Sequence, residues 1–208
     1  MSTEALKLIC AMDRNRLEAQ IGLQCAPLLT GLKISNLLTI PSKMRQQVSQ
    51  VFRKTGISVF LLYQSSQKTT FFLYREQELE WALKKKKVRK MMEQLGYQST
   101  HLPDLLRQVA ERYEAHMALR EEFPHELGLL LGYPPEDVAG FILHKGKNFL
   151  YSGYWKVYEN PEKSLILFQQ FESAREEIVR MMSAGISIEE ILEFYQSRRV
   201  TSLKSMAV

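Results

Sequence analysis

ISVFLLYQSSQKTTFFLY, residues 57–74, is the stretch that decides the fold class of this chain. β-Branched and aromatic residues dominate residues 57–63 and 69–74, and the polar connection between them is short enough for a hairpin. Both runs are apolar almost throughout, which is typical of strands that are covered on both faces. We therefore expect a β-hairpin in a sheet with both faces covered.

Sequence patterns on both sides of this hairpin predict helices. Apolar residues recur at helical spacing in residues 44–54, 102–119 and 161–182, and residues 76–95 fit one or two helices. Residues 34–40 resemble a short strand that Pro41 ends. Helices therefore dominate the chain outside the hairpin.

Residues 149–158, FLYSGYWKVY, are the other long β-type run. A two-stranded hairpin is too small to be stable alone, so we expect this aromatic strand to pair with residues 57–74. Gly153 would mark a bulge or the close approach of another backbone. The predicted fold is α+β, with a mixed sheet that contains the β-hairpin and the aromatic strand and is flanked by several helices.

The length of 208 residues fits one medium domain, and no internal repeat or low-complexity linker divides the chain. We expect a single α+β domain over residues 1–197 and a frayed tail over residues 198–208.

Composition predicts a cytoplasmic protein without a membrane segment. Hydrophobic residues make up 45% of the chain and charged residues 25%, which is the balance of a soluble globular protein. The start of the chain reaches charged residues too soon for a signal peptide, and no apolar run approaches the ~20 residues that span a bilayer. Cys10 and Cys25 show no CxxC or Cys/His ligand spacing, which suits a reducing compartment.

Part of the net charge of +5 comes from KKKKVRK, residues 84–90. We interpret this run as a solvated helix face, because it lacks the interleaved aromatic residues that stack on bases. Nucleic acid and membranes are therefore not expected as partners, and the sequence leaves the oligomeric state open.

Candidate functional residues gather in FPHELGLLLGYPPEDVAGFILHKGKNFLYSGYWKVY, residues 123–158. This segment holds five of the chain's ten glycines, which are usual where a backbone turns or approaches another group closely. It contains no phosphate loop, nucleophile elbow or dinucleotide fingerprint. HELGL lacks the second histidine of HExxH, so no metal site is predicted and the cofactor is left open.

The motifs FPHE, LGYP, DV, GFI and SGYWKVY, in this order, resemble a family of uncharacterised bacterial proteins, mostly from anaerobic Gram-positive bacteria, known as a domain of unknown function. The N-terminal CAPLLTGLKISNLL is also similar to that family's opening pattern. The resemblance covers most of the chain. It implies a cytoplasmic single domain and no established activity, substrate or cofactor.

The preferred functional hypothesis is a small-ligand-binding or regulatory protein. Aromatic residues of the segment could line a mostly apolar pocket with a few polar anchors, which is the usual composition of a small-molecule site. The alternative is that the same aromatic side chains only fill the core. The residues of this candidate site are His125, Glu126, Tyr133, Tyr154, Trp155, Lys156 and Lys33.

The alternative hypothesis is a cysteine-dependent hydrolase or transferase. Cys25 would be the nucleophile, His125 the base, and Asp137 or Glu126 the group that orients the base. We expect a short helix to start close to Cys25, so that the helix dipole would stabilise its thiolate. The sequence does not decide whether the chain is an enzyme.

Overall fold

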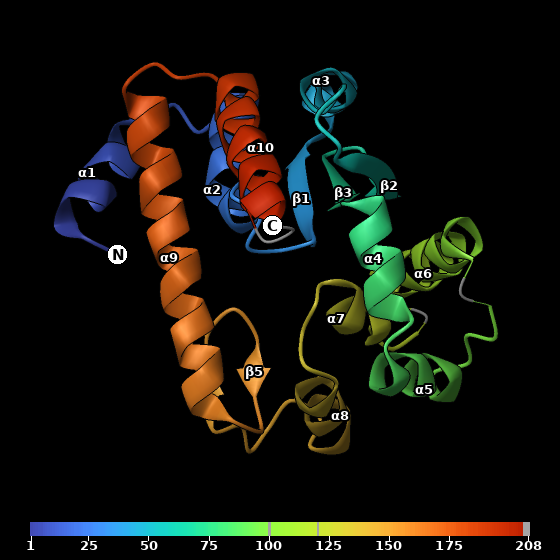
Figure 1. Ribbon diagram of the computed structural model, residues 1–208. Helices are drawn as coiled ribbons and strands as arrows, with labels where there is room; N and C mark the ends of the chain where they lie inside the picture. Colours follow the sequence, from blue (N-terminus) through green and yellow to red (C-terminus); the bar gives the residue numbers. More distant parts are fainter. Residues whose placement is uncertain (100, 120, 206–208) are drawn as a thin grey trace.

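The computed structural model describes residues 1–99, 101–119 and 121–205, the last seven of them by their backbone alone. The fold is α+β, as the sequence predicts (Figure 1). The strands are β1 (Ser35–Pro41), β2 (Ser58–Gln64), β3 (Lys68–Tyr74), β4 (Tyr151–Ser152) and β5 (Lys156–Val157). The helices are α1 (Thr3–Ala11), α2 (Leu17–Leu29), η1 (Ser42–Met44), α3 (Arg45–Val51), α4 (Glu76–Leu83), α5 (Lys86–Gln94), α6 (Leu102–Met117), α7 (Glu126–Leu130), α8 (Pro135–Leu143), α9 (Pro161–Ser183) and α10 (Ile188–Ser205).

The predicted hairpin is confirmed as β2 and β3, which form a three-stranded antiparallel sheet with β1 in the order β1-β3-β2. β3 is the central strand, so Phe72 lies opposite Leu37 on one side and Phe60 on the other. The strand expected at residues 34–40 is therefore the third member of the sheet.

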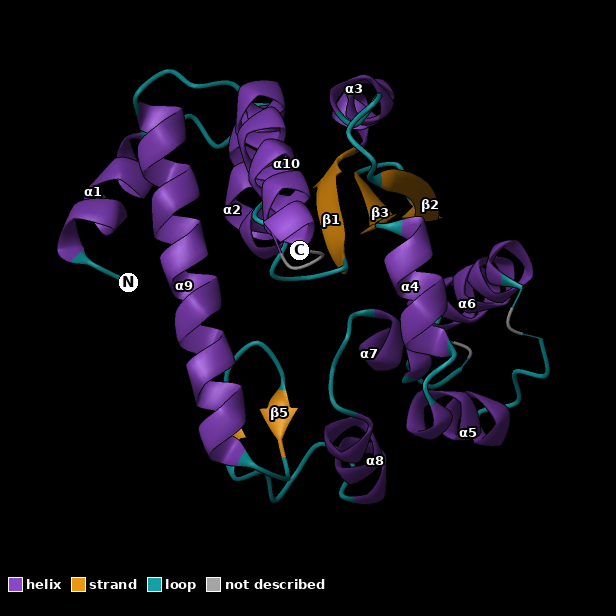
Figure 2. Ribbon diagram, viewed as in Figure 1, coloured by secondary structure: helices purple, strands orange, loops and turns teal. Residues whose placement is uncertain are grey.

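The sheet separates two cores, because successive side chains of a strand point to opposite faces. Phe71 and Leu73 of β3 belong to a first core that α2, α3, α9 and α10 complete. Phe72 belongs to a second core, built with α4 to α8. Figure 2 shows α2, α9 and α10 on one side of the sheet and α4, α5 and α6 on the other. The prediction that both faces are covered is confirmed.

The predicted pairing of residues 149–158 with the hairpin is wrong. These residues fold back on themselves as β4 and β5, a separate two-stranded sheet in which Tyr151 lies opposite Val157. β1 pairs with the edge of β3 that β2 leaves open, so β1 is the third strand that the hairpin needs. The reversal lies at Gly153, where an added Cβ atom would lie 2.4 Å from the ring of Phe168 on α9.

The start of one helix differs from expectation. α2 begins at Leu17 rather than near Cys25, and Pro27 lies in its last turn. The described backbone of α10 reaches Ser205, and the frayed tail expected over residues 198–208 stays a prediction. Residues 206–208 of that stretch lie outside the described residues. None of the helices in the described part of the chain is long and apolar enough to cross a membrane.

Candidate functional site

A cavity of about 370 Å³ lies between α7, α8 and the β4–β5 hairpin. This volume is within the ~300–1,000 Å³ of typical small-molecule sites. Its wall is mostly apolar and aromatic, and we call it the aromatic cavity. The residues on which the argument below depends are Phe123, His125, Tyr133, Phe141, Trp155 and Lys156.

The glycines of this segment are explained by the backbone and by close packing. Gly132 and Gly146 have φ values of +79° and +70° at the ends of α7 and α8, which favour glycine. At Gly128 a Cβ atom would lie 2.9 Å from Val138, and at Gly140 it would lie 2.4 Å from the ring of Tyr158. Their density therefore reflects how tightly α7, α8 and the hairpin pack, and it does not itself point to a ligand.

Stacked aromatic rings form the floor of the cavity. The ring of Tyr133 stacks on Trp155 with centroids 4.9 Å apart, and Trp155 meets Phe168 of α9 edge-on at 4.5 Å. Trp155 is only 8% exposed, so most of its surface is buried in the protein. One face of the cavity is therefore fixed before any ligand enters.

Asp137 ties α8 to the hairpin. Its carboxylate is buried and accepts hydrogen bonds from the Trp155 indole at 2.7 Å and from the backbone amides of Tyr158 at 2.7 Å and Glu159 at 3.0 Å. Both oxygens are occupied by these donors. The partners are not the imidazole that Asp137 was predicted to orient, so its role here is structural.

His125 is the polar group that the protein leaves available at the cavity wall. Its ring lies 5.5 Å from the ring of Phe141 and 6.1 Å from that of Phe123, measured between centroids. No described residue forms a hydrogen bond with its imidazole. A half-buried imidazole without a protein partner can donate to or accept from a bound molecule.

Lys156 supplies a positive charge on the same wall. Its ammonium donates to the Gly146 carbonyl at 2.6 Å and lies over the rings of Phe141 and Phe149, 5.6 and 5.0 Å from their centroids. An ammonium carries three donors, so this arrangement fixes its position and leaves hydrogen-bonding capacity.

Glu126 points away from the cavity. It is 1% exposed and accepts hydrogen bonds from the Tyr97 hydroxyl and, at 3.1 Å, from Arg112. Burial and the neighbouring carboxylate raise the pKa of Tyr97, so its hydroxyl remains a donor. These bonds anchor α7 to α6 and to the chain that follows α5.

Lys33 and Tyr154 lie behind the cavity wall. Lys33 is 9% exposed, and its ammonium donates to the Asn36 side-chain oxygen at 3.3 Å and lies 5.5 Å from the centroid of the Tyr133 ring. Burial lowers the pKa of Lys33 to about 8. Tyr154 donates to Glu172 of α9 at 2.8 Å. Of the predicted ligand-binding residues, the structure brings His125, Tyr133, Trp155 and Lys156 together at the cavity.

Cys25 lies in the first core, eight positions after α2 begins, so the start of that helix does not stabilise its thiolate. Its side chain is 0% exposed, its sulfur accepts a hydrogen bond from the Asn36 amide at 3.5 Å, and burial raises its pKa to about 12. Such a thiol stays protonated near neutral pH, and the thiolate is the form that attacks a substrate. Its role as a nucleophile stays a prediction that neither its burial nor its pKa favours.

Several residues of the lining were not among the sequence candidates, and Leu37 and Phe123 are two of them. Phe123 opens the FPHE motif and could have been included for that reason. Leu37 comes from β1, far away in sequence, and no local pattern connects it to the motif segment.

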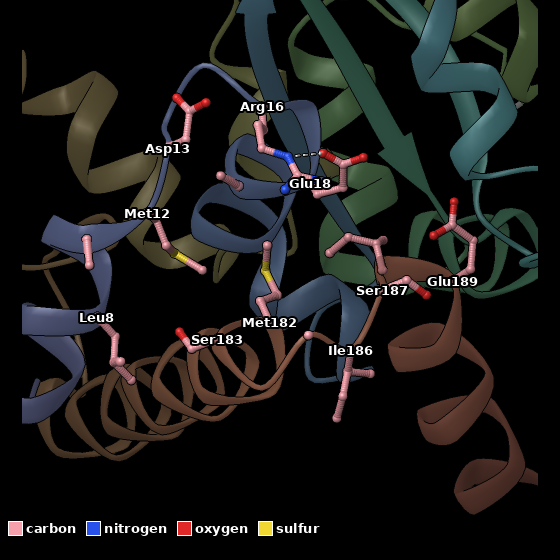
Figure 3. A pocket seen from close by; sticks show the side chains of 14 residues that line it. Leu8, Met12, Asp13, Arg16, Glu18, Met182, Ser183, Ile186, Ser187 and Glu189 are labelled. Carbon is pink, nitrogen blue, oxygen red and sulfur yellow. Dashed lines mark ion pairs between the residues drawn. The ribbon is translucent and has the colours of Figure 1, made fainter.

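A second cavity of about 550 Å³ lies between α1, α2, α9 and α10. The side chains of Met12 and Met182 project into it, and Arg16 and Glu18 form an ion pair at its rim with 3.6 Å between nitrogen and oxygen (Figure 3). Among the described residues, no group of three or more histidine, cysteine or acidic side chains is placed to hold a metal ion.

A family model described as "Protein of unknown function (DUF3793)" matches residues 21–192. The chain belongs to this family. No curated protein and no solved structure matches it. All lining residues of the aromatic cavity fall within the matched range, whereas half of those around the second cavity, in residues 8–19, precede it. The aromatic cavity therefore lies wholly within the family region.

Proposed function

We propose that this protein binds a small, planar, mostly apolar molecule in the aromatic cavity and acts as a ligand-binding or regulatory protein. The observation that carries the proposal is the His125 imidazole, which lies at the wall of a preformed apolar cavity with no hydrogen bond to a described residue. A few polar groups in an apolar cavity of this size are the usual composition of a small-molecule site.

The rings of the wall indicate the shape of the ligand, and the polar groups indicate its chemistry. Phe123, Tyr133, Phe141 and Trp155 offer ring faces and edges, which favour a flat molecule. His125 and Lys156 can both donate hydrogen bonds, so we expect an acceptor or an anionic group on one edge of the ligand.

The surroundings favour binding over catalysis. Two carboxylates were predicted to orient His125, those of Glu126 and Asp137. Both accept hydrogen bonds from other groups of the protein. Cys25 is buried in the first core. A bound molecule would contact α7, α8 and the hairpin at once, and such a bridge could couple occupancy to the stability of this end of the molecule.

The test is a screen of planar aromatic and heteroaromatic carboxylates and their neutral analogues by thermal shift, followed by calorimetry. We expect carboxylates to raise the melting temperature of the wild-type chain, and Phe123→Ala and His125→Ala to weaken their binding. The matched control is Phe194→Ala, because Phe194 is 42% exposed on α10 and Phe123 is 40% exposed. Ligands that bind both Phe→Ala variants equally, or a screen without any ligand, would contradict the proposal.

A further inference from the structure

The segment from Leu143 to Tyr151 exposes large apolar side chains at one end of the molecule. Leu143 is 76% exposed and Leu150 is 63% exposed, and Phe149 and Tyr151 are each more than 40% exposed. Isolated exposed apolar residues are ordinary, whereas several in one short segment mark an interaction surface.

The backbone holds these side chains outward in a fixed loop. Lys145, Gly146 and Asn148 have φ values of +50°, +70° and +56°. The Gly146 amide donates to the Phe141 carbonyl at 2.9 Å, its carbonyl accepts from Lys156, and the Leu150 amide donates to Val157 at 2.8 Å. The exposure of Leu143 and Leu150 is therefore a property of an ordered segment.

Positive charge surrounds this loop. From residue 138 to residue 158 the chain has three lysines and no acidic residue. α5 packs on α8 and is joined to it by the Lys87–Glu136 ion pair, and Figure 1 shows α5, α8 and the β5 region at the same end of the molecule. Four lysines of the basic run form no ion pair with a described carboxylate: Lys84, Lys85, Lys86 and Lys90.

We propose that this end, formed by α5 and residues 143–151, docks on the surface of an anionic lipid bilayer. Leu143 and Leu150 would enter the boundary between headgroups and acyl chains, while the lysines would face the anionic headgroups. This contact is peripheral, because no described helix can span a membrane. It goes beyond the proposed ligand binding and differs from the expectation of a merely solvated basic run, because the structure adds the apolar loop beside that run.

Two other occupants fit the surface less well. A second copy of this chain, related by a two-fold axis, would bring the same lysines face to face, which costs free energy. A nucleic acid would match the charge and could stack on Phe149 and Tyr151, but the two most exposed apolar side chains of the segment, Leu143 and Leu150, are aliphatic and do not stack on bases. A bilayer offers both anionic headgroups and hydrocarbon.

The test is co-sedimentation of the full chain with vesicles of phosphatidylcholine, with and without phosphatidylserine, at low and high salt. We expect binding only to the phosphatidylserine vesicles, weakening as salt rises. Leu143→Ser/Leu150→Ser should weaken binding more than ~10-fold, because each leucine loses its burial in the bilayer. Lys145→Gln and Lys147→Gln should each weaken it about fivefold. The matched control is Leu6→Ser on α1, where the leucine is 46% exposed.

Each possible result decides for or against the proposal. Loss of vesicle binding in the double leucine variant, with wild-type thermal stability and normal binding by Leu6→Ser, supports it. No binding to phosphatidylserine vesicles at low salt overturns it, and so does binding that the double leucine variant retains in full. Salt-sensitive binding to a generic nucleic-acid duplex, equally strong in the wild type and in the Leu143→Ser/Leu150→Ser variant, would assign the surface to nucleic acid. A dimer that this variant abolishes, without vesicle binding, would assign it to self-association.

Discussion

At the scale of single residues, the polar groups of the motif segment mainly fasten the fold. Asp137 and Glu126 were candidates for orienting a catalytic histidine, yet each is buried and engaged by protein donors. Buried carboxylates need such partners, because an unpaired buried charge is costly. Acidic residues that could indicate a catalytic site in the sequence therefore hold neighbouring elements of this fold together.

Replacing Asp137 by alanine should lower the free energy of unfolding by about 3 kcal/mol, because three donors, among them the buried Trp155 indole, would lose their acceptor. Glu136→Ala on the same helix is the control, since the Glu136 carboxylate forms a partly exposed ion pair with Lys87 and its loss should cost less than about 1 kcal/mol. Urea denaturation measures both. Equal losses in the two variants would show that the Asp137 bonds contribute nothing specific.

Lys33 gives stability a distinct dependence on pH. Its pKa is about 8 in the folded protein against an ordinary value of 10.5. Below pH 8 the amine is charged in both states, and the folded state carries the full cost of burying it. Between pH 8 and pH 10.5 the unfolded state binds more protons than the folded state, so Lys33 makes the free energy of unfolding rise with pH. Above pH 10.5 the amine is neutral in both states, and the cost of burying its charge has disappeared.

Lys33→Met should therefore stabilise the protein at neutral pH, by roughly 3 kcal/mol at most, because each pKa unit corresponds to ~1.4 kcal/mol. The advantage over the wild type should shrink as the pH rises from 8 to 10.5. Denaturation of both proteins across this range measures it. Comparing them at each pH cancels most of the opposite contribution of Cys25, whose raised pKa makes stability fall with pH above its ordinary value of 9.0. A constant difference between the two proteins would contradict the explanation.

At the scale of elements, the β4–β5 hairpin owes its stability to one indole. Trp155 stacks on Tyr133, meets Phe168 edge-on and bonds to Asp137, so it joins the hairpin to α8 and α9. A hairpin whose two strands have two residues each has little stability of its own. The aromatic residues of this segment thus have two roles, since those that support the hairpin also form the cavity floor.

Trp155→Ala should cost about 3–5 kcal/mol, as expected for a buried large aromatic residue. Tyr151→Ala, on the same hairpin but 43% exposed, should cost less than about 1 kcal/mol and is the matched control. Thermal and urea unfolding measure both variants. If Trp155→Ala kept wild-type stability, the packing described for the hairpin would be wrong.

The sequence predicts the positions of helices and strands far better than it predicts which of them pack together. Local patterns at residues 57–74 predict the hairpin, and the helical spacing of apolar residues over 161–182 predicts α9. The choice of β1 rather than residues 149–158 as the third strand depends on contacts between distant parts of the chain. For the same reason the sequence could identify four of the ligand-binding residues at the cavity. It could not predict that the side chains of Lys33 and Glu126 point away from the cavity.

At the scale of the whole molecule, the sheet divides the protein into two cores of different origin along the chain. The second core draws its buried residues from Leu62 to Val138. The first core combines residues between Leu17 and Leu73 with Ile178 to Leu192. Its completion therefore depends on residues at opposite ends of the sequence.

This division has a consequence for biosynthesis. As the polypeptide leaves the ribosome, residues 62–138 can collapse around β3 before the later helices exist, since their contacts are relatively local. α2 can pack on β1 early, but the side of it that contacts α9 and α10 stays open until those helices have been translated. Between those moments a nascent chain exposes the apolar surface of α2 that the late helices will cover, which is the kind of surface that chaperones bind and that aggregates when synthesis stops early.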